Sequence, residues 1–260
     1  MIKRYASCTR ILAAMVLVLA LSMPVAAFEV GVVGYYEFPE FTGTLRVDQG
    51  GVVGTDIDVE DELNMGDESY PAVEAFFGMG SHHVRVKYTK ADYSGENNIP
   101  RTINYKGQTY LSGTFVESEL NFTMIDAEYQ YDLIDLENIL AGFSVGLIGK
   151  IKYIDGETRL RATSAGLDES ETFTAPIPMV GVGLHVGILA DILEARAKAA
   201  GIAYSDSTFY EGMAEVTVTP FPFIDIHGGY RYMKLDLDDF SDIYADVEFK
   251  GPYAGITVGF

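Results

Sequence analysis

The feature that most constrains this chain is a period-two alternation of apolar residues with small or polar ones. Met179–Leu189 alternates valine, leucine and isoleucine with glycine and histidine, and Ala141–Ile154 and Ile224–Tyr232 follow the same period. Successive side chains of a β-strand point to opposite faces, so each segment predicts a strand with one apolar face. After residue 27, no stretch contains the roughly 18 uninterrupted apolar residues expected of a transmembrane helix.

The polar faces of these segments mix charged residues with glycine, which suits a crowded barrel interior better than a water-facing sheet. The segments predict an all-β fold, a transmembrane antiparallel up-and-down β-barrel of about ten strands. Phe41–Val47 is a further candidate strand, so eight or twelve strands remain open. The predicted strands are Phe28–Phe38, Tyr70–Met79, His82–Tyr93, Val116–Tyr131, Ala141–Ile154, Thr174–Leu189, Leu193–Tyr204, Phe209–Thr219, Phe223–Leu235 and Val247–Phe260.

Three segments fit the strand pattern poorly. Leu193–Ala200 has better helix than strand propensity, but without it the strand count is odd and the chain ends fall on opposite sides of the membrane. In Val116–Tyr131 the apolar phase slips between Met124 and Ile125, which predicts a β-bulge. Asp132–Leu140 is long for a tight turn and is a candidate for a helical turn.

The connections between predicted strands alternate in length. Short ones, at Gly78–Ser81, Ala190–Ile192 and Pro220–Pro222, are expected to face the periplasm. Most of the longer ones are rich in acidic residues, glycine and serine and are expected to face outward. They are Pro39–Ser69, Ser94–Phe115, Asp155–Phe173 and Asp236–Asp246.

Residues 1–27 have the pattern of a cleaved signal peptide. Lys3, Arg4 and Arg10 precede the apolar stretch Ile11–Leu21, and Val25-Ala26-Ala27 offers small residues for cleavage. The barrel domain would then be residues 28–260. Cys8, the single cysteine, lies in the leader, so the mature chain would have no thiol or disulfide. The formal charge of −20 excludes nucleic acid as a natural partner.

The chain ends at Phe260, and Ala254, Ile256 and Val258 precede it at alternate positions. With the leader and the alternating strands, this ending resembles the bacterial outer-membrane β-barrel families. Their last strand ends in an aromatic residue that the barrel-assembly machinery reads. The resemblance covers the mature chain without identifying one family. It implies a monomer in the cell outer membrane, in contact with lipid and lipopolysaccharide.

Charges of both signs fall on the polar faces of the predicted strands. A buried charge is costly unless it is paired, so we expect a packed lumen filled by ion pairs and a structural or surface-interaction role. A narrow channel for small solutes is the alternative, although ten strands enclose far less space than a porin. The predicted network comprises Glu74, Arg85, Lys87, Glu119, Lys150, Lys152, Arg196, Lys198, Glu211, Glu215 and Arg231.

An outer-membrane enzyme is the second alternative. Asp225 and His227, with the carboxylates at Asp56 and Asp58, have a spacing that resembles the omptin-type proteases. However, they follow a predicted periplasmic turn, whereas omptin chemistry lies at the outer rim. His185 is a further weak candidate for lipid acyl hydrolysis, because ester cleavage needs an activated hydroxyl.

Acidic loop clusters suggest oxygen ligands for divalent cations, and the weak metal candidates are Asp56, Asp58, Asp236, Asp238 and Asp239. Neither cluster has the EF-hand pattern. We therefore expect solvated loops and no cofactor.

Overall fold

The computed structural model describes residues 28–136, 142–189, 192–240 and 242–260. The predicted signal peptide lies outside them. None of the described residues forms a helix long and apolar enough to cross a bilayer. The elements are β1 (Phe28–Glu37), β2 (Glu40–Val47), β3 (Ile57–Asp58), β4 (Tyr70–Met79), β5 (His82–Asn98), β6 (Ile103–Tyr105), β7 (Gln108–Tyr110), β8 (Phe115–Asp135), β9 (Phe143–Ala162), the 3₁₀ turn η1 (Thr163–Ala165), β10 (Leu167–Leu189), β11 (Leu193–Tyr204), β12 (Ser207–Phe221), β13 (Ile224–Phe240) and β14 (Ile243–Gly259).

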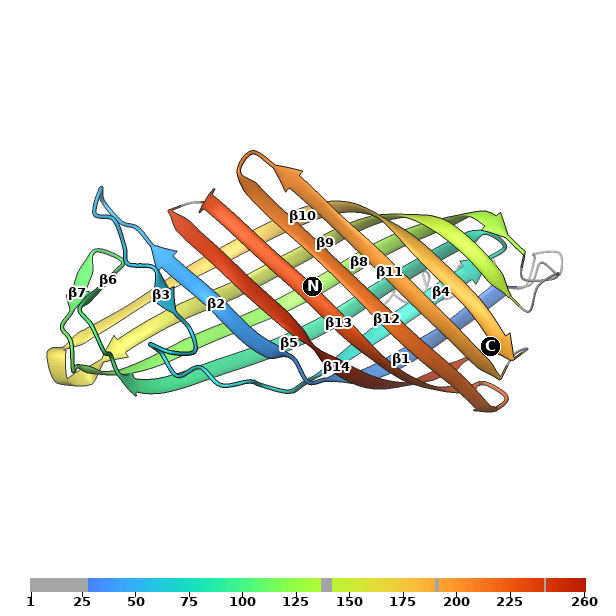
Figure 1. The fold of residues 1–260 in the computed structure, drawn as a ribbon, viewed down its shortest axis with the longest axis horizontal. Coiled ribbons are helices and arrows are strands. Elements are labelled where there is room, and N and C mark those ends of the chain that lie inside the picture. The colour runs from blue at the N-terminus through green and yellow to red at the C-terminus, as the bar shows by residue number, and fades with distance from the viewer. Residues whose placement is uncertain (1–27, 137–141, 190–191, 241) are drawn as a thin grey trace, which may run out of the picture.

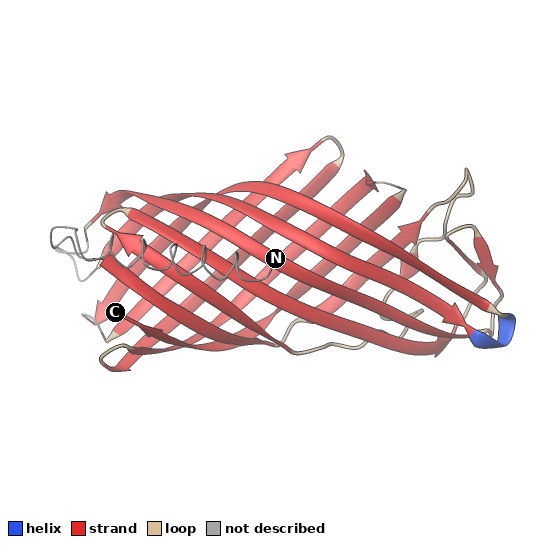
Figure 2. Cartoon of the chain, turned by 180° about the vertical axis from the view of Figure 1, so that it is seen from behind, coloured by secondary structure: helices blue, strands red, loops and turns tan. Residues whose placement is uncertain are grey.

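The long strands close into one antiparallel barrel (Figures 1 and 2). They pair in the order β1-β4-β5-β8-β9-β10-β11-β12-β13-β14, and β14 pairs again with β1. The prediction of a ten-stranded up-and-down barrel is therefore confirmed. The helix-prone segment Leu193–Ala200 is indeed a strand, because β11 pairs along its length with β12.

Two short strands share the position that closes the barrel. β1 pairs with the last residues of β14, and β2 pairs with its first residues. Pro39 separates them, and Gly251 allows the close approach at this break. A Cβ atom on Gly251 would lie 2.1 Å from the backbone carbonyl oxygen of Phe38. The candidate strand Phe41–Val47 therefore prolongs the closing strand of the barrel and adds no new position to it.

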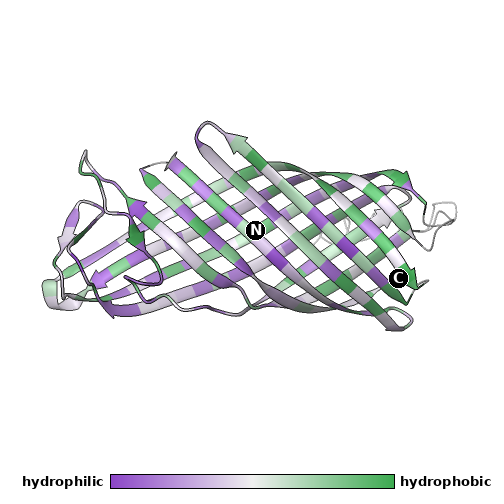
Figure 3. Cartoon of the chain, viewed as in Figure 1, coloured by the Kyte–Doolittle hydropathy of each residue, from purple (hydrophilic) through white to green (hydrophobic). Residues whose placement is uncertain are grey.

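An apolar band covers the outward face, bounded by two rings of exposed aromatic side chains. On β9 the apolar band runs from Phe143 to Tyr153. For a strand tilted by roughly 40°, this length corresponds to a band about 25 Å high along the barrel axis. Figure 3 shows the underlying alternation along each strand. The inner ring contains Phe28, Phe77, Tyr129, Tyr131, Phe221, Phe223 and Phe260, and the outer ring contains Tyr36, Phe38, Tyr88, Tyr153, Tyr210 and Tyr230.

Beyond the outer ring the polarity of the wall reverses. On β8 the inward residues Leu120, Phe122 and Met124 are buried in an apolar core, whereas Asp126, further along the same face, belongs to a charged region. The predicted β-bulge in Val116–Tyr131 is therefore wrong. β8 pairs with β5 and β9 without a register shift throughout this segment. The phase appeared to slip because one face changes from apolar to charged.

The same reversal explains why two predicted loops are largely strand. Residues 155–173 form the ends of β9 and β10 around η1, residues 236–240 form the end of β13, and residues 243–246 form the start of β14. Their outward side chains, such as Asp155 and Glu157, are exposed, and their inward neighbours are apolar. Acidic composition therefore marked a wall that projects into water, not an irregular loop.

The segment 57–69 and the hairpin of β6 and β7 form a cap over the outer end of the barrel, here called the roof. Ile57, Val59 and Leu63 are buried in the apolar core below it. The Tyr110 hydroxyl donates a hydrogen bond to the Leu160 carbonyl oxygen at 3.1 Å and so fixes the hairpin to β9. The Arg101 guanidinium pairs with the Glu62 carboxylate within the roof.

We predict that Arg101→Gln loosens the roof at neutral pH. The hydrogen bonds from Arg101 lower the pKa of Glu62. A lowered folded-state pKa stabilises the fold above the unfolded value, and this stabilisation is lost as the pH falls through the folded value. Amide hydrogen exchange in residues 57–69 should therefore be faster in the variant at pH 7, and the difference should shrink below about pH 4.

Lys90→Gln is the matched control, because Lys90 pairs with Asp92 on the exposed outward face of β5. It should leave exchange in the roof unchanged. An equal effect of both substitutions, or one independent of pH, would contradict the role of the Arg101–Glu62 pair.

Candidate functional site in the barrel lumen

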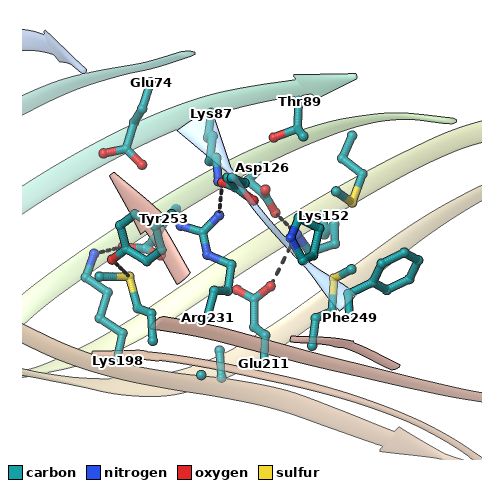
Figure 4. A pocket seen from close by; sticks show the side chains of 18 of the residues that line it. Glu74, Lys87, Thr89, Asp126, Lys152, Lys198, Glu211, Arg231, Phe249 and Tyr253 are labelled. Carbon is teal, nitrogen blue, oxygen red and sulfur yellow. Dashed lines mark hydrogen bonds and ion pairs between the residues drawn. The ribbon is translucent and has the colours of Figure 1, made fainter. Parts of the chain in front are cut away.

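A group of charged side chains crosses the lumen between the apolar half under the roof and the end of the barrel that carries Phe28 and Phe260 (Figure 4). Strand alternation turns these side chains inward, so all of them meet in one interior space. We call this group the central cluster. It comprises Glu37, Glu74, Arg85, Lys87, Asp126, Glu128, Lys150, Lys152, Lys198, Glu211 and Arg231.

Two lysines and two carboxylates form the core of the central cluster. Lys152 Nζ lies 2.6 Å from Asp126 Oδ1 and 3.2 Å from Glu211 Oε2. Lys150 Nζ lies 3.2 Å from Asp126 Oδ1 and also pairs with Glu211. Asp126 is on β8 and Glu211 on β12, so the lysines connect opposite parts of the wall. The set is electrically balanced, as burial of charge requires.

Further ion pairs extend this connection around the lumen. Glu37 on β1 accepts from Lys87 and from Arg231, whose Nη1 lies 2.5 Å from Glu37 Oε1. Lys198 on β11 pairs with Glu128 on β8. Because β9 and β10 separate those two strands in the sheet, this pair too reaches across the interior.

Little space remains within the central cluster. The cavity that it surrounds has a volume of about 80 Å³. A water molecule needs roughly 10–15 Å³ of such space, so the cavity has room for several waters but not for a wide pore. Lys87, Asp126 and Lys152 are at most 5% exposed. The geometry is that of a filled lumen with paired charges.

A second polar group surrounds His227, nearer the end of the barrel that carries Phe28 and Phe260. Its Nδ1 lies 3.2 Å from Glu215 Oε1, and its Nε2 is hydrogen-bonded to the Thr257 hydroxyl. The order hydroxyl, imidazole, carboxylate is that of a catalytic triad. However, the three residues are at most 4% exposed, so a substrate cannot reach them in this structure. Asp225 accepts instead from Thr219 Oγ1 at 2.7 Å.

The other inward histidines also pair with carboxylates. His83 Nε2 lies 3.1 Å from Asp132 Oδ2, and His185 Nε2 lies 3.2 Å from Glu194 Oε2. Arg196 contacts the same Glu194 oxygen at 3.1 Å. These contacts surround a small polar cavity of about 60 Å³. The arrangement pairs charges and brings no serine hydroxyl onto either histidine among the contacts described.

The structure turns each predicted lumen residue inward except Glu119. Glu119 lies on the outward face of β8, opposite Arg159 of β9, between the buried residues Ser118 and Leu120. Its prediction as a lumen residue is therefore wrong, because the supposed bulge reversed its face. Sequence reasoning also missed Glu37. Its position two residues after Tyr35 and four after Val33, on the inward face of β1, was the available signal.

The acidic metal candidates are not brought together. Asp56 pairs with Arg46 at 3.1 Å, and Asp58 accepts backbone N–H groups of Glu60 and Asp61. Asp236 and Asp238 lie on β13, and the side chain of Asp239 lies outside the described residues. Among the described residues, no group of three or more histidine, cysteine, aspartate or glutamate side chains could hold a metal ion.

The residues of the C-terminal pattern lie on the lipid-facing side of β14. Ala254, Ile256 and Val258 alternate outward, with the last two more than half exposed. The Phe260 ring packs edge to face on Phe28, with 6.1 Å between ring centroids. The two ends of the barrel domain therefore meet in the inner aromatic ring.

Comparison with known proteins identifies no single family. No protein-family model matches the chain, and no curated protein matches its sequence. Among solved structures, the outer-membrane protease OmpT of Escherichia coli aligns with a TM-score of 0.47 and 9% identity, over 88% of this chain and 97% of that one.

Two further structures align over similar lengths. The β domain of the Bordetella autotransporter BrkA has a TM-score of 0.43 and 12% identity, over 89% of this chain and 100% of its own. The attachment invasion locus protein Ail of Yersinia pestis has a TM-score of 0.40 and 11% identity, over 91% of this chain and 100% of that one. The closed wall, the lipid-facing band and the aromatic rings identify this chain as a β-barrel of the bacterial outer membrane.

We predict that Asp126→Asn destabilises the barrel, because it leaves Lys150 and Lys152 with one carboxylate between them. Removal of one partner from a buried ion pair typically costs about 3–5 kcal/mol. The urea midpoint of unfolding, followed by the heat-modifiable shift in gel mobility, should fall accordingly. Glu119→Gln on the outward face of the same strand should change stability by less than about 0.5 kcal/mol. Equal midpoints for the two variants would refute the assignment of Asp126 to a buried network.

Proposed function

We propose that this protein is a closed, non-conducting outer-membrane barrel that works at the cell surface through its outer half. The observation that carries the proposal is the core of the central cluster. Asp126, Lys150, Lys152 and Glu211 join opposite sides of the lumen and leave only a small cavity. Such a network opposes the passage of solutes, because displacing one charge leaves another buried without its partner.

The projecting outer half supports a role at the surface. β8, β9 and β10 continue beyond the outer aromatic ring and present polar outward faces. Arg159 pairs with Asp168 at 2.6 Å, and Arg161 pairs with Glu117 at 2.5 Å. These pairs leave an acidic excess on a chain of formal charge −20. The protein would act as a monomer among outer-membrane lipid and lipopolysaccharide, inserted by the barrel-assembly machinery.

The burial of the His227 group supports a structural role for it over a catalytic one. The His227 ring is hydrogen-bonded to the hydroxyl groups of Thr217 and Thr257. The Tyr253 hydroxyl donates a hydrogen bond to Glu215 at 2.9 Å. A polar group that is fully paired and inaccessible stabilises one packing of the lumen. Hydrolysis of a lipid or peptide therefore receives no support from this geometry.

Conductance of the purified protein in planar bilayers tests the proposal. We expect no large, stable current steps from the natural sequence. Joint replacement of Asp126, Lys150, Lys152 and Glu211 by alanine widens the central cluster, but the roof still covers the outer end of the barrel. Current steps should therefore appear only when residues 57–69 are deleted as well. The quadruple change removes equal numbers of positive and negative charges, so it leaves no net charge behind.

The natural protein would instead be a narrow channel if it conducted stably and if Lys152→Glu changed the ion selectivity of the current. The matched control is Glu119→Ala with Arg159→Ala, which removes one charge of each sign from the outward face. This double variant should show no stable current steps, like the natural protein. Conductance appearing equally in this control would show leakage through damaged barrels.

A further inference from the structure

The outer half of the lumen contains an apolar chamber that is distinct in chemistry from the central cluster. Side chains of β2, β8, β9, β10, β12, β13 and β14 surround a cavity of about 90 Å³, and no polar surface faces it. Phe209, Leu235 and Ala245 are among its lining residues. An engineered apolar cavity of roughly 150 Å³ stays dry and binds benzene, so this smaller cavity has room for only a few carbon atoms. The chamber therefore has the chemistry of a binding site for a hydrocarbon group.

The chamber is closed below and covered above. Met124, Met233 and Phe249 line both the chamber and the central cluster, so they separate the two. The roof lies at the outer end of the same apolar core, held by the hydrogen bond of Tyr105 to Thr158 and by the bond of Tyr110 to β9. Neither end offers an apolar molecule a direct path.

The side wall is different, because only one edge of the outer half of β10 is paired with another strand among the described residues. It pairs with β9 from Leu167 onward, but with β11 only from Val180 to Leu189. Along residues 167–179 its second edge has no strand pairing in the part of the chain that the structure describes. In Figure 1, β9 and β10 run well past the tip of the β11–β12 hairpin.

The sequence of this edge fits an opening. Pro176 and Pro178 have no N–H to offer a neighbouring strand, and proline in sheets is confined largely to edges. Further out, Lys106 Nζ donates to the backbone carbonyl oxygen of Ser170 and so satisfies part of the edge. The inward residues between them, Phe173 and Ile177, line the chamber. The unpaired edge is thus also a wall of the apolar cavity.

We propose that the chamber binds the terminal few carbon atoms of one neutral alkyl or acyl chain, and that this chain enters sideways between β10 and the β12–β13 sheet. The opening begins where the lipid-facing band of β10 ends, since Pro176 and Pro178 give way to the exposed Thr174 and Thr172. A chain could thus pass from the outer leaflet without crossing water. The acidic outer surface disfavours a negatively charged head group. This site is independent of whether the central cluster conducts.

A tryptophan reporter makes the binding measurable, because the natural chain contains no tryptophan. Phe209→Trp places the indole at the chamber wall on β12. The protein is held in nanodiscs of unbrominated lipid and titrated with 12-bromododecanol, whose bromine quenches nearby indole fluorescence, with dodecanol as the blank. A second preparation with dibrominated phosphatidylcholine in the disc tests whether a lipid acyl chain reaches the same site.

Two substitutions of alanine on β14 form a matched pair. Ala245→Phe fills the chamber, whereas Ala254→Phe adds the same ring on the lipid-facing side. We expect quenching of the reporter by at least one of the two brominated probes. Ala245→Phe should reduce that quenching to the level of the blank, and Ala254→Phe should retain it.

Absence of quenching with both probes, or equal quenching in the two alanine variants, would overturn the proposal. Heat-modifiable gel mobility verifies that each variant is folded. If Ala245→Phe does not fold, Val247→Phe, on the same inward face of β14, takes its place with the same expected loss. Loss of quenching in Ala245→Phe would support the chamber as a binding site. The absence of current steps from the natural protein would support the proposed function, and the two results are independent of each other.

Discussion

The need to satisfy every backbone hydrogen bond within lipid determines the rest of this structure. Hydrocarbon offers no water to an exposed N–H or C=O group, so the sheet must close on itself. The closing strand meets that need in two pieces, β1 and β2, with Pro39 at the break and Gly251 beside it. The contact of Phe28 with Phe260 then fixes both ends of the domain in the inner aromatic ring.

The same constraint explains why the outer half is built differently. Above the lipid band water can satisfy a strand edge, so pairing there is optional. The wall accordingly reverses its polarity, with Asp155 outward and Leu160 inward on β9. One edge of β10 has no strand partner along residues 167–179 within the described chain. A single chain thus combines a membrane-spanning part with polar contents and a water-exposed part with an apolar core.

Much of the fold could be predicted from sequence, because alternation is preserved in every long strand, even in the helix-prone β11. Alternation alone does not say which face is inward, since that depends on what surrounds the strand. For this reason the sequence pattern wrongly predicts Glu119 in the lumen and a β-bulge in β8. Glu37 and the His227 contacts depend on neighbours distant in sequence, and the local pattern carries no information about their pairing.

The balanced set of Asp126, Lys150, Lys152 and Glu211 has a consequence for how the barrel is assembled. Its members come from β8, β9 and β12, so none of the pairs between β8–β9 and β12 can form until the sheet has curled. A hairpin inserted one residue out of register would turn a lysine or glutamate toward hydrocarbon. The charges thereby penalise misaligned closure, and a lumen filled for stability also acts as a check on strand alignment during insertion.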